Sequence, residues 1–238
     1  LIFPHHENEI AQSEAANGKD FSKYWLHNGF LNIDNRKMSK SLGNFFTVRE
    51  IGEKYDLQVL RFFMLSAHYR SPLNFSAELM EAAKNGLERI VTAAEHLKFL
   101  LEGAKTENMT EKEQEKIVKS QEFTRKFEKA MDDDFNTADA IAAVFDLVKF
   151  INTNTDGESS KEYLQNLLSQ LVALTDVLGI IVEKEQEMLA DDIEALIAER
   201  QAARKERNFA RADEIRDELL AKGIILEDTR EGVKWKRA

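Results

Sequence analysis

Three things are scarce or absent in this chain of 238 residues: it has no cysteine, only two prolines and no long apolar run. Without cysteine the chain can form no disulfide bond and offers no thiolate to a metal, which fits a reducing compartment. A membrane-spanning helix needs about 18 or more consecutive apolar residues, and none occur together. The chain also opens without the segments of a secretory signal. We therefore expect a cytoplasmic protein that makes no membrane contact.

The first three residues, Leu1, Ile2 and Phe3, are apolar, and no methionine or polar lead-in precedes them. Such a stretch is typical of a buried strand. A strand that starts at the first residue lacks its upstream neighbour. We therefore expect a part of a longer protein, cut within a domain.

The net charge of −10 is concentrated in the middle of the chain. Residues 105–192 carry 20 acidic and 10 basic side chains, whereas residues 1–104 and 193–238 are nearly balanced. Repulsion of a polyanion therefore falls mainly on the middle segment, and the two ends remain able to contact phosphates.

Helix-forming residues dominate, and local signals place several helices. Thr47 and Glu50 form the pattern of a capping box, and Asp56 is suited to cap the helix that follows it. A long helix is expected from Ser76 to Gly103 because apolar residues recur at steps of three and four. Its apolar stripe is predicted to consist of Leu79, Ala83, Leu87, Ile90, Ala94, Leu97 and Leu101.

The middle segment is predicted to be a helical bundle. The polar stretch 104–116 indicates a linker or an exposed turn, and a helix is expected from Asn136 and Thr137. After a loop at residues 152–160, a further helix is expected to end at Gly179 in a left-handed C-cap. The buried positions of these two helices are predicted to be Ile141, Val144, Phe145, Val148 and Ile151, then Tyr163, Leu167, Leu171, Leu174 and Leu178.

The last 46 residues form a different unit. Residues 193–207 and 209–223 read as two helices, the second ended by Gly223. Residues 224–236 then read as a small hairpin, with a turn that contains Gly232.

The stretch "FPHHENE", residues 3–9, contains a pair of possible metal ligands. On a helix that starts at Pro4, His5 and Glu9 project from the same face one turn apart, as two ligands of one metal require. The simpler interpretation is a solvated first helical turn, where acidic residues suit the helix dipole. A zinc site needs four ligands, so this pair cannot complete one.

The stretch "KMSKS", residues 37–41, is a second candidate site. It places Lys37 and Lys40 three residues apart, beside serines and close to the flexible Gly43. A mobile basic loop of this kind can follow negative charge as it builds on a phosphate chain. Taken alone, the same pentapeptide also fits an ordinary solvated loop.

Several stretches together resemble the cysteinyl-tRNA synthetase family of the class I aminoacyl-tRNA synthetases. The resemblance covers nearly the whole chain. The matching stretches are "FPHHENEIAQSE", "YWLHNGF", "KMSKSLGNFFTVRE", "LRFFMLSAHYRSPLNFS", "DDDFNTADAIAAVFDL" and "ADEIRDELLAKGIILEDT".

The resemblance implies a ligase that activates cysteine with ATP and magnesium and then transfers it to tRNA(Cys). In that family one zinc ion, held by two cysteines, a histidine and a glutamate, binds the substrate thiolate, and sulfur is a ligand that zinc prefers. His5 and Glu9 match the last two ligands. Both cysteines and the HIGH motif would lie upstream, so we expect the chain alone to be inactive. Lys40 matches the ATP contact, and Lys37 is expected to assist.

The resemblance also implies a mainly α architecture in four parts. Residues 1–46 would be the end of a Rossmann-type catalytic domain, and 47–104 a helical segment that contacts the tRNA stem. Residues 105–192 would be an anticodon-binding helical bundle, and 193–238 a small helix-plus-hairpin unit that recognises the anticodon. The parent enzyme would be a monomer.

The anticodon readers of the family match Arg204, Phe209, Asp213 and Asp228. Arginine and aspartate can bind base edges, and an aromatic ring can stack on an unpaired base. The family position of Phe209 can be tryptophan, so stacking here would cover less area. Asp213 could instead pair with a neighbouring basic residue, and Phe209 could be a core residue. Trp235 is interpreted as hairpin core.

One further interpretation concerns an acidic run, and two concern the function of the whole chain. The run Asp132 to Asp134 is interpreted as a solvated cap at the start of a helix, in preference to a magnesium site. A related ligase that joins cysteine to an amino sugar would share the first 50 residues, but the C-terminal unit favours tRNA. A stand-alone tRNA-binding or scaffold module is the alternative without chemistry.

Overall fold

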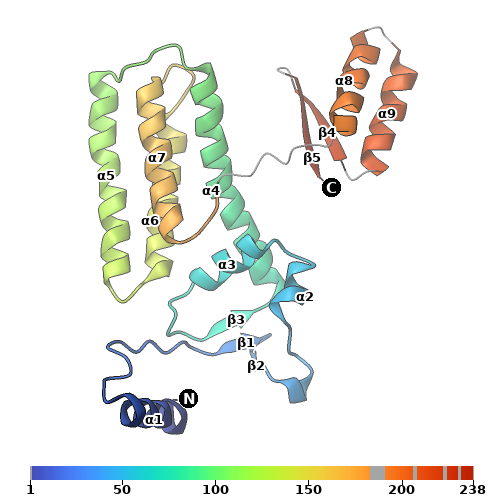
Figure 1. The fold of residues 1–238 in the computed structure, drawn as a ribbon. Coiled ribbons are helices and arrows are strands. Elements are labelled where there is room, and N and C mark those ends of the chain that lie inside the picture. Colours follow the sequence, from blue (N-terminus) through green and yellow to red (C-terminus); the bar gives the residue numbers. More distant parts are fainter. Residues whose placement is uncertain (1, 183–190, 206–207, 222–223, 230–231, 238) are drawn as a thin grey trace. The chain divides into compact units, whose positions relative to one another are not determined.

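The computed structural model describes residues 2–182, 191–205, 208–221, 224–229 and 232–237. It divides into two compact units, Leu1–Glu183 and Lys184–Ala238 (Figure 1). Helices dominate the first unit, whereas the second combines two helices with a hairpin.

The first unit opens with an irregular helical turn, η1 (Ile2–His6), and helix α1 (Glu7–Asn17), neither of which has a buried residue. Phe3 is extended, with φ −115° and ψ 135°, but Ile2 and Phe3 belong to neither sheet of the described chain. The prediction of a strand at Leu1–Phe3 is therefore wrong for its two described residues. An extended backbone becomes a strand only when another strand pairs with it, and neither sheet offers them a partner.

A small sheet follows, in the order β2, β1, β3. Strand β1 (Leu31–Ile33) pairs antiparallel with β2 (Arg36–Lys37) and parallel with β3 (Leu73–Phe75). The turn η2 (Lys40–Leu42) comes after β2. This sheet therefore joins residues 31–37 to residues 73–75, which lie more than 30 positions later in the chain.

The predicted caps of the next two helices are confirmed. Thr47 and Glu50 form a complete capping box at α2 (Val48–Gly52). The carboxylate of Asp56 accepts a hydrogen bond from the Gln58 amide at the start of α3 (Leu57–Leu65), whose Phe62 and Phe63 are buried. These short polar signals were sufficient because each acts within one helical turn.

Four helices run alongside one another in the bundle: α4 (Ala77–Gly103), α5 (Glu111–Asp132), α6 (Thr137–Asn154) and α7 (Lys161–Val177) (Figure 1). Their buried apolar faces form one continuous core together with Phe62 and Phe63 of α3. The stripe predicted for α4 is confirmed from Ala83 to Leu97, but Leu79 is 42% exposed and Met80 is fully buried in its place. The apolar faces predicted for α6 and α7 are confirmed.

Helix α5 was not predicted, and its first turn occupies the second half of the stretch interpreted as a linker, 104–116. A capping box between Thr110 and Glu113 starts this helix, and Glu113 is buried. The Glu113 carboxylate also accepts hydrogen bonds from the backbone and hydroxyl of Ser160, the N-cap of α7. One carboxylate therefore ties the starts of two helices together.

The loop after α6 is shorter than predicted, because the helix continues to Asn154. Gly179 adopts the predicted left-handed conformation after α7, with φ 63°. The guanidinium of Arg61 on α3 donates to the Leu178 carbonyl at 2.7 Å and fills the space beside Gly179.

The second unit contains α8 (Asp191–Lys205), α9 (Phe209–Ala221) and a hairpin of β4 (Ile224–Thr229) with β5 (Gly232–Arg237). Its core contains Ile215, Leu219 and Ile224. The two helices and the hairpin form as predicted, but Gly232 is the first residue of β5 and pairs with Thr229, so its predicted place in the turn is wrong. Gly223 lies outside the described residues. Across the described ranges, no helix is long and apolar enough to cross a membrane.

Candidate functional site

The lysine loop extends from β2 to α2. The tight turn between β1 and β2 is made by Asp34 and Asn35, both with positive φ, and Lys37 ends β2 with its side chain exposed. Lys40 starts the turn η2, and its side chain lies outside what the structure describes. The structure therefore places both lysines on the same short loop.

Asn44 closes the base of this loop. Its amide nitrogen donates to the Lys37 carbonyl at 3.1 Å, and its side-chain oxygen accepts from the Ser39 amide at 2.9 Å. Gly43 has φ 66° and nothing within 4 Å of where a side chain would begin. Among the described residues Lys37 makes no ion pair. An exposed cation on a loop with a closed base can meet an anionic ligand without breaking an internal contact.

The candidate metal ligands lie on different elements. His5 is in η1 and Glu9 is in α1, and both are exposed. The neighbouring His6 contacts two residues of the loop that follows α1. Its Nδ1 lies 2.9 Å from Nε2 of His27, and its ring stacks on Trp25. Sequence reasoning did not identify this pair.

The described residues do not fit a complete zinc site. They contain no group of three or more histidine, cysteine, aspartate or glutamate side chains placed to hold a metal ion. Structural zinc takes four ligands and catalytic zinc three protein ligands plus water. His5 and Glu9 alone therefore supply at most half of a site.

The candidate anticodon readers lie in the second unit. Arg204 is exposed near the end of α8. Phe209 is the first residue of α9 and 61% exposed, so the alternative of a core phenylalanine is wrong. Asp213 is exposed one helical turn later. Two exposed residues spaced four apart on one helix face can contact one ligand together.

Asp228 lies in β4, opposite Val233, and Trp235 lies in β5, opposite Leu226. Their side chains are outside the described part of the chain. The ion pairs described in this unit join Arg211 to Glu199 and Glu214, at 2.9 Å and 3.1 Å. The pair with Glu199 fastens α9 to α8, whereas the pair with Glu214 lies within α9. Hydrogen bonds to both glutamates raise the pKa of Arg211.

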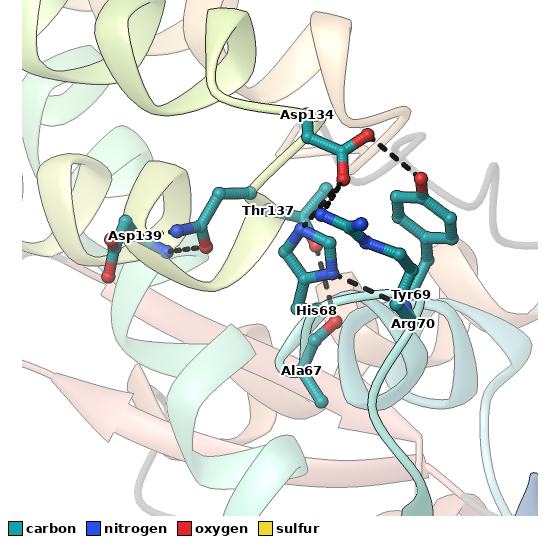
Figure 2. Close-up of polar contacts among 8 residues, drawn as sticks. Ala67, His68, Tyr69, Arg70, Asp134, Thr137 and Asp139 are labelled. Carbon is teal, nitrogen blue, oxygen red and sulfur yellow. Dashed lines mark hydrogen bonds and ion pairs between the residues drawn. The ribbon is translucent and has the colours of Figure 1, made fainter. Parts of the chain in front are cut away.

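The acidic run at 132–134 is not the start of a helix. Asp132 ends α5, and Asn136 caps α6 through the Asp139 amide. Asp134 instead turns toward the segment that follows α3 (Figure 2). Its carboxylate accepts a hydrogen bond from the Tyr69 hydroxyl at 2.8 Å and pairs with Arg70. The interpretation of a solvated cap is therefore wrong for Asp134, whose partners lie too far along the sequence for a local pattern to reveal.

Three family models match consecutive parts of the chain. The model described as "tRNA synthetases class I (C) catalytic domain" matches residues 1–85. The "DALR domain" matches residues 126–183, and the "Cysteinyl-tRNA ligase anticodon binding domain" matches residues 186–235.

Curated relatives align along the full length of this chain. A cysteine–tRNA ligase of Lachnospira eligens is 68% identical over 238 residues, which are 100% of this chain and 50% of that protein. Ligases of the same name from Lachnoclostridium phytofermentans and Clostridioides difficile are 59% and 55% identical, again over 100% of this chain and 52% and 51% of theirs. The chain thus spans about half the length of the curated relatives it matches.

A solved structure shares the fold of part of this chain. The crystal structure of the ternary complex of Agrobacterium radiobacter K84 agnB2 LeuRS-tRNA-LeuAMS matches with a TM-score of 0.53 and 23% identity. The match covers 62% of this chain and 20% of that one. At this identity the likeness concerns the fold alone.

Proposed function

Because this chain belongs to the cysteine–tRNA ligase family, we propose that it supplies the lysine loop and the tRNA-binding regions of an enzyme that joins cysteine to tRNA(Cys). The observation that carries the proposal is the order of the three family matches along the chain: catalytic domain, DALR domain, anticodon-binding domain. The reaction would activate cysteine with ATP and magnesium and then transfer it to the tRNA.

In this proposal Lys37 and Lys40 stabilise the negative charge that develops on the phosphates of ATP. Such catalysis is mainly electrostatic and depends on donors held in place before the charge appears. Asn44 supports this role because its side chain fastens the backbone on both sides of Met38. Lys40 is assigned the ATP contact, and Lys37 the supporting charge.

His5 and Glu9 are proposed only as two donors toward a zinc ion. Zinc in this position would bind the thiolate of the substrate cysteine. A complete site needs donors beyond the described residues. The roles proposed for Lys37 and Lys40 do not involve the metal.

The second unit is proposed to recognise the anticodon. Phe209 is exposed at the start of α9, where its ring can stack on an unpaired base. Arg204, Asp213 and Asp228 would bind base edges by hydrogen bonds. Residues 193–238 are nearly balanced in charge, whereas residues 105–192 are strongly acidic, so this unit repels phosphates less than the bundle does.

The functional parts in this proposal are 1–46 for the lysine loop, 47–104 for the tRNA stem, 105–192 for the anticodon-binding bundle and 193–238 for anticodon recognition. The parent enzyme would be a cytoplasmic monomer. A ligase that uses an amino-sugar acceptor would not need an anticodon-binding domain at residues 186–235. A stand-alone tRNA-binding module would not need the match to a catalytic domain at residues 1–85. The two matches together therefore favour the tRNA ligase.

The test compares binding of tRNA(Cys) to the chain and to its Phe209→Ala variant. We expect the variant to bind about tenfold more weakly, which corresponds to the loss of one stacked base. Leu220→Ala is the matched control, because Leu220 lies on the same helix and is 54% exposed. Equal binding by the chain and both variants would refute anticodon stacking by Phe209.

A further inference from the structure

The turn at residues 68–71 is a compact structure with contacts on two sides. The Arg70 amide donates to Nδ1 of His68 at 3.3 Å, and the Ser71 amide donates to the His68 carbonyl at 2.9 Å. The rings of His68 and Tyr69 stack with centroids 4.9 Å apart. These contacts hold residues 68–71 together as one turn.

One side of this turn faces the helical bundle (Figure 2). Asp134 accepts the hydrogen bond from the Tyr69 hydroxyl, pairs with the guanidinium of Arg70 and lies 3.8 Å from Nε2 of His68. The Thr137 hydroxyl donates to the Ala67 carbonyl at 3.5 Å. Asp134 is thus the acidic group on which the side chains of His68, Tyr69 and Arg70 converge.

The backbone holds the Asp134 carboxylate in this direction. Asp134 and Phe135 both have left-handed backbones, with φ 55° and 54°, which residues other than glycine rarely adopt. The amides of Phe135 and Asn136 donate back to carbonyls of α5, at 3.1 Å each, and fix this reversal. Such a conformation persists where the surrounding structure determines it, often at a functional position.

The other side of the turn faces the strands that lead to the lysine loop. The Gly29 amide donates to the Tyr69 carbonyl at 2.7 Å, and a side chain at Gly29 would overlap the backbone of Ser71. The Leu73 amide donates to the Phe30 carbonyl at 2.9 Å, and β3 then pairs with β1. Through β1, whose Asn32 lies opposite Lys37, the position of the turn sets the start of the lysine loop.

We propose that Asp134 is a positioning residue, which couples the α5–α6 turn of the bundle to the loop that carries Lys37 and Lys40. The contacts form a continuous route. The Asp134 carboxylate binds Tyr69 and Arg70, the Tyr69 carbonyl accepts from the Gly29 amide just before β1, and β1 pairs with β2. Hydrogen bonds, ion pairs and paired strands connected in this way can carry energetic coupling between distant groups. The proposal rests on the proposed function in one respect: it takes tRNA(Cys) as the ligand that acts on the bundle.

The first test needs no ligand. Asp134→Asn keeps the shape and an acceptor for Tyr69 but removes the charge that pairs with Arg70. Hydrogen exchange measured on the full chain should become about tenfold faster over residues 29–44 and stay unchanged over residues 164–174 of α7. Asp133→Asn, an equal change of charge at the exposed neighbouring residue, should leave both regions unchanged. No change over 29–44, or equal changes in both regions, would refute the proposal.

A milder variant guards against misfolding of Asp134→Asn. Tyr69→Phe removes only the hydroxyl that donates to Asp134, and we expect about threefold faster exchange over residues 29–44. Unchanged exchange in this variant and in a folded Asp134→Asn would leave no role for the carboxylate in holding the turn.

The second test separates coupling from simple support. When tRNA(Cys) is added to the unaltered chain, exchange over residues 36–44 should slow. Asp134→Asn should bind the tRNA within about twofold of the same affinity but lose this slowing. Slowing of equal size in both proteins would refute the coupling. If the unaltered chain does not bind the tRNA, the proposed function fails, and the exchange comparison without ligand still decides whether Asp134 positions the loop.

Discussion

Replacing Glu113 with glutamine tests whether one buried carboxylate fastens two helices of the bundle. Its Oε2 atom accepts from the Thr110 amide at 2.8 Å, and its Oε1 atom accepts from the Ser160 amide at 2.9 Å. A glutamine has only one acceptor oxygen, so one of these two amides would face an NH2 group. A buried donor without its acceptor costs about 1–3 kcal/mol, and we expect a loss near the middle of this range, about 2 kcal/mol.

The loss should depend on pH. Burial raises the pKa of the Glu113 carboxyl, but the hydrogen bonds from Ser160 and Thr110 together lower it more, so the pKa lies below its ordinary value of 4.5. A lowered pKa means that the charged carboxylate contributes stability above pH 4.5, and that this contribution is lost as the pH falls through the lower pKa of the folded state. The difference between Glu113 and glutamine should therefore be smaller in acid, below this lowered pKa, than at neutral pH.

The assay is urea unfolding followed by far-ultraviolet circular dichroism, which reports mainly on the helices of the bundle. Glu115→Gln is the control, because it removes the same charge from an exposed position on α5 and measures the relief of repulsion in this acidic segment. We expect its effect to stay within about 0.5 kcal/mol. A loss below that limit for Glu113→Gln, or an equal loss at both pH values, would refute the reasoning.

Three other predictions can be checked with the same chain. Gly29→Ala should lower the expressed soluble yield and speed hydrogen exchange in β1 and β3, because the new side chain would overlap the Ser71 backbone. Gly157→Ala is the control: the space beside Gly157 is open, so this variant should show neither effect. Gly179→Ala should destabilise the bundle by about 1–2 kcal/mol in urea unfolding, because φ is 63° and the new side chain would lie 2.6 Å from the Arg61 guanidinium; an unchanged unfolding midpoint would contradict this. Burial raises the pKa of Tyr163 to about 12, so ionisation favours the unfolded state and stability should fall as the pH rises from about 10 toward 12. A spectroscopic titration compared with Tyr163→Phe should show this late phenolate, and its appearance near pH 10 in the folded chain would contradict the burial.

The sequence predicted those features that depend on a few neighbouring residues. The caps at Thr47, Asp56 and Gly179, and the apolar faces of α6 and α7, follow from spacing and local chemistry. Helix α5 begins at a capping box between Thr110 and Glu113, but the polar residues around this pair are equally typical of a linker. The capping box is the signal that could have located the helix.

Other features depend on partners far along the chain, and local patterns do not reveal them. Asp134 was misinterpreted because its contacts lie 64 to 66 residues earlier and need two left-handed residues to form. The lysine loop could be located from its motif, but its attachment to the 68–71 turn required the pairing of β1 with β3. The roles proposed for Lys40 and for the candidate anticodon readers rest on the family resemblance, since spacing alone does not separate these residues from solvated surface residues.

The measurement that tests the central claim most directly is the affinity of the full chain for tRNA(Cys) and for the same tRNA with a changed anticodon, at two salt concentrations. The account predicts a clear preference for the native anticodon that persists at the higher salt concentration, because base contacts depend on salt less than phosphate contacts do. Equal binding of both tRNAs that disappears with salt would mean contact with phosphates alone and would contradict anticodon recognition.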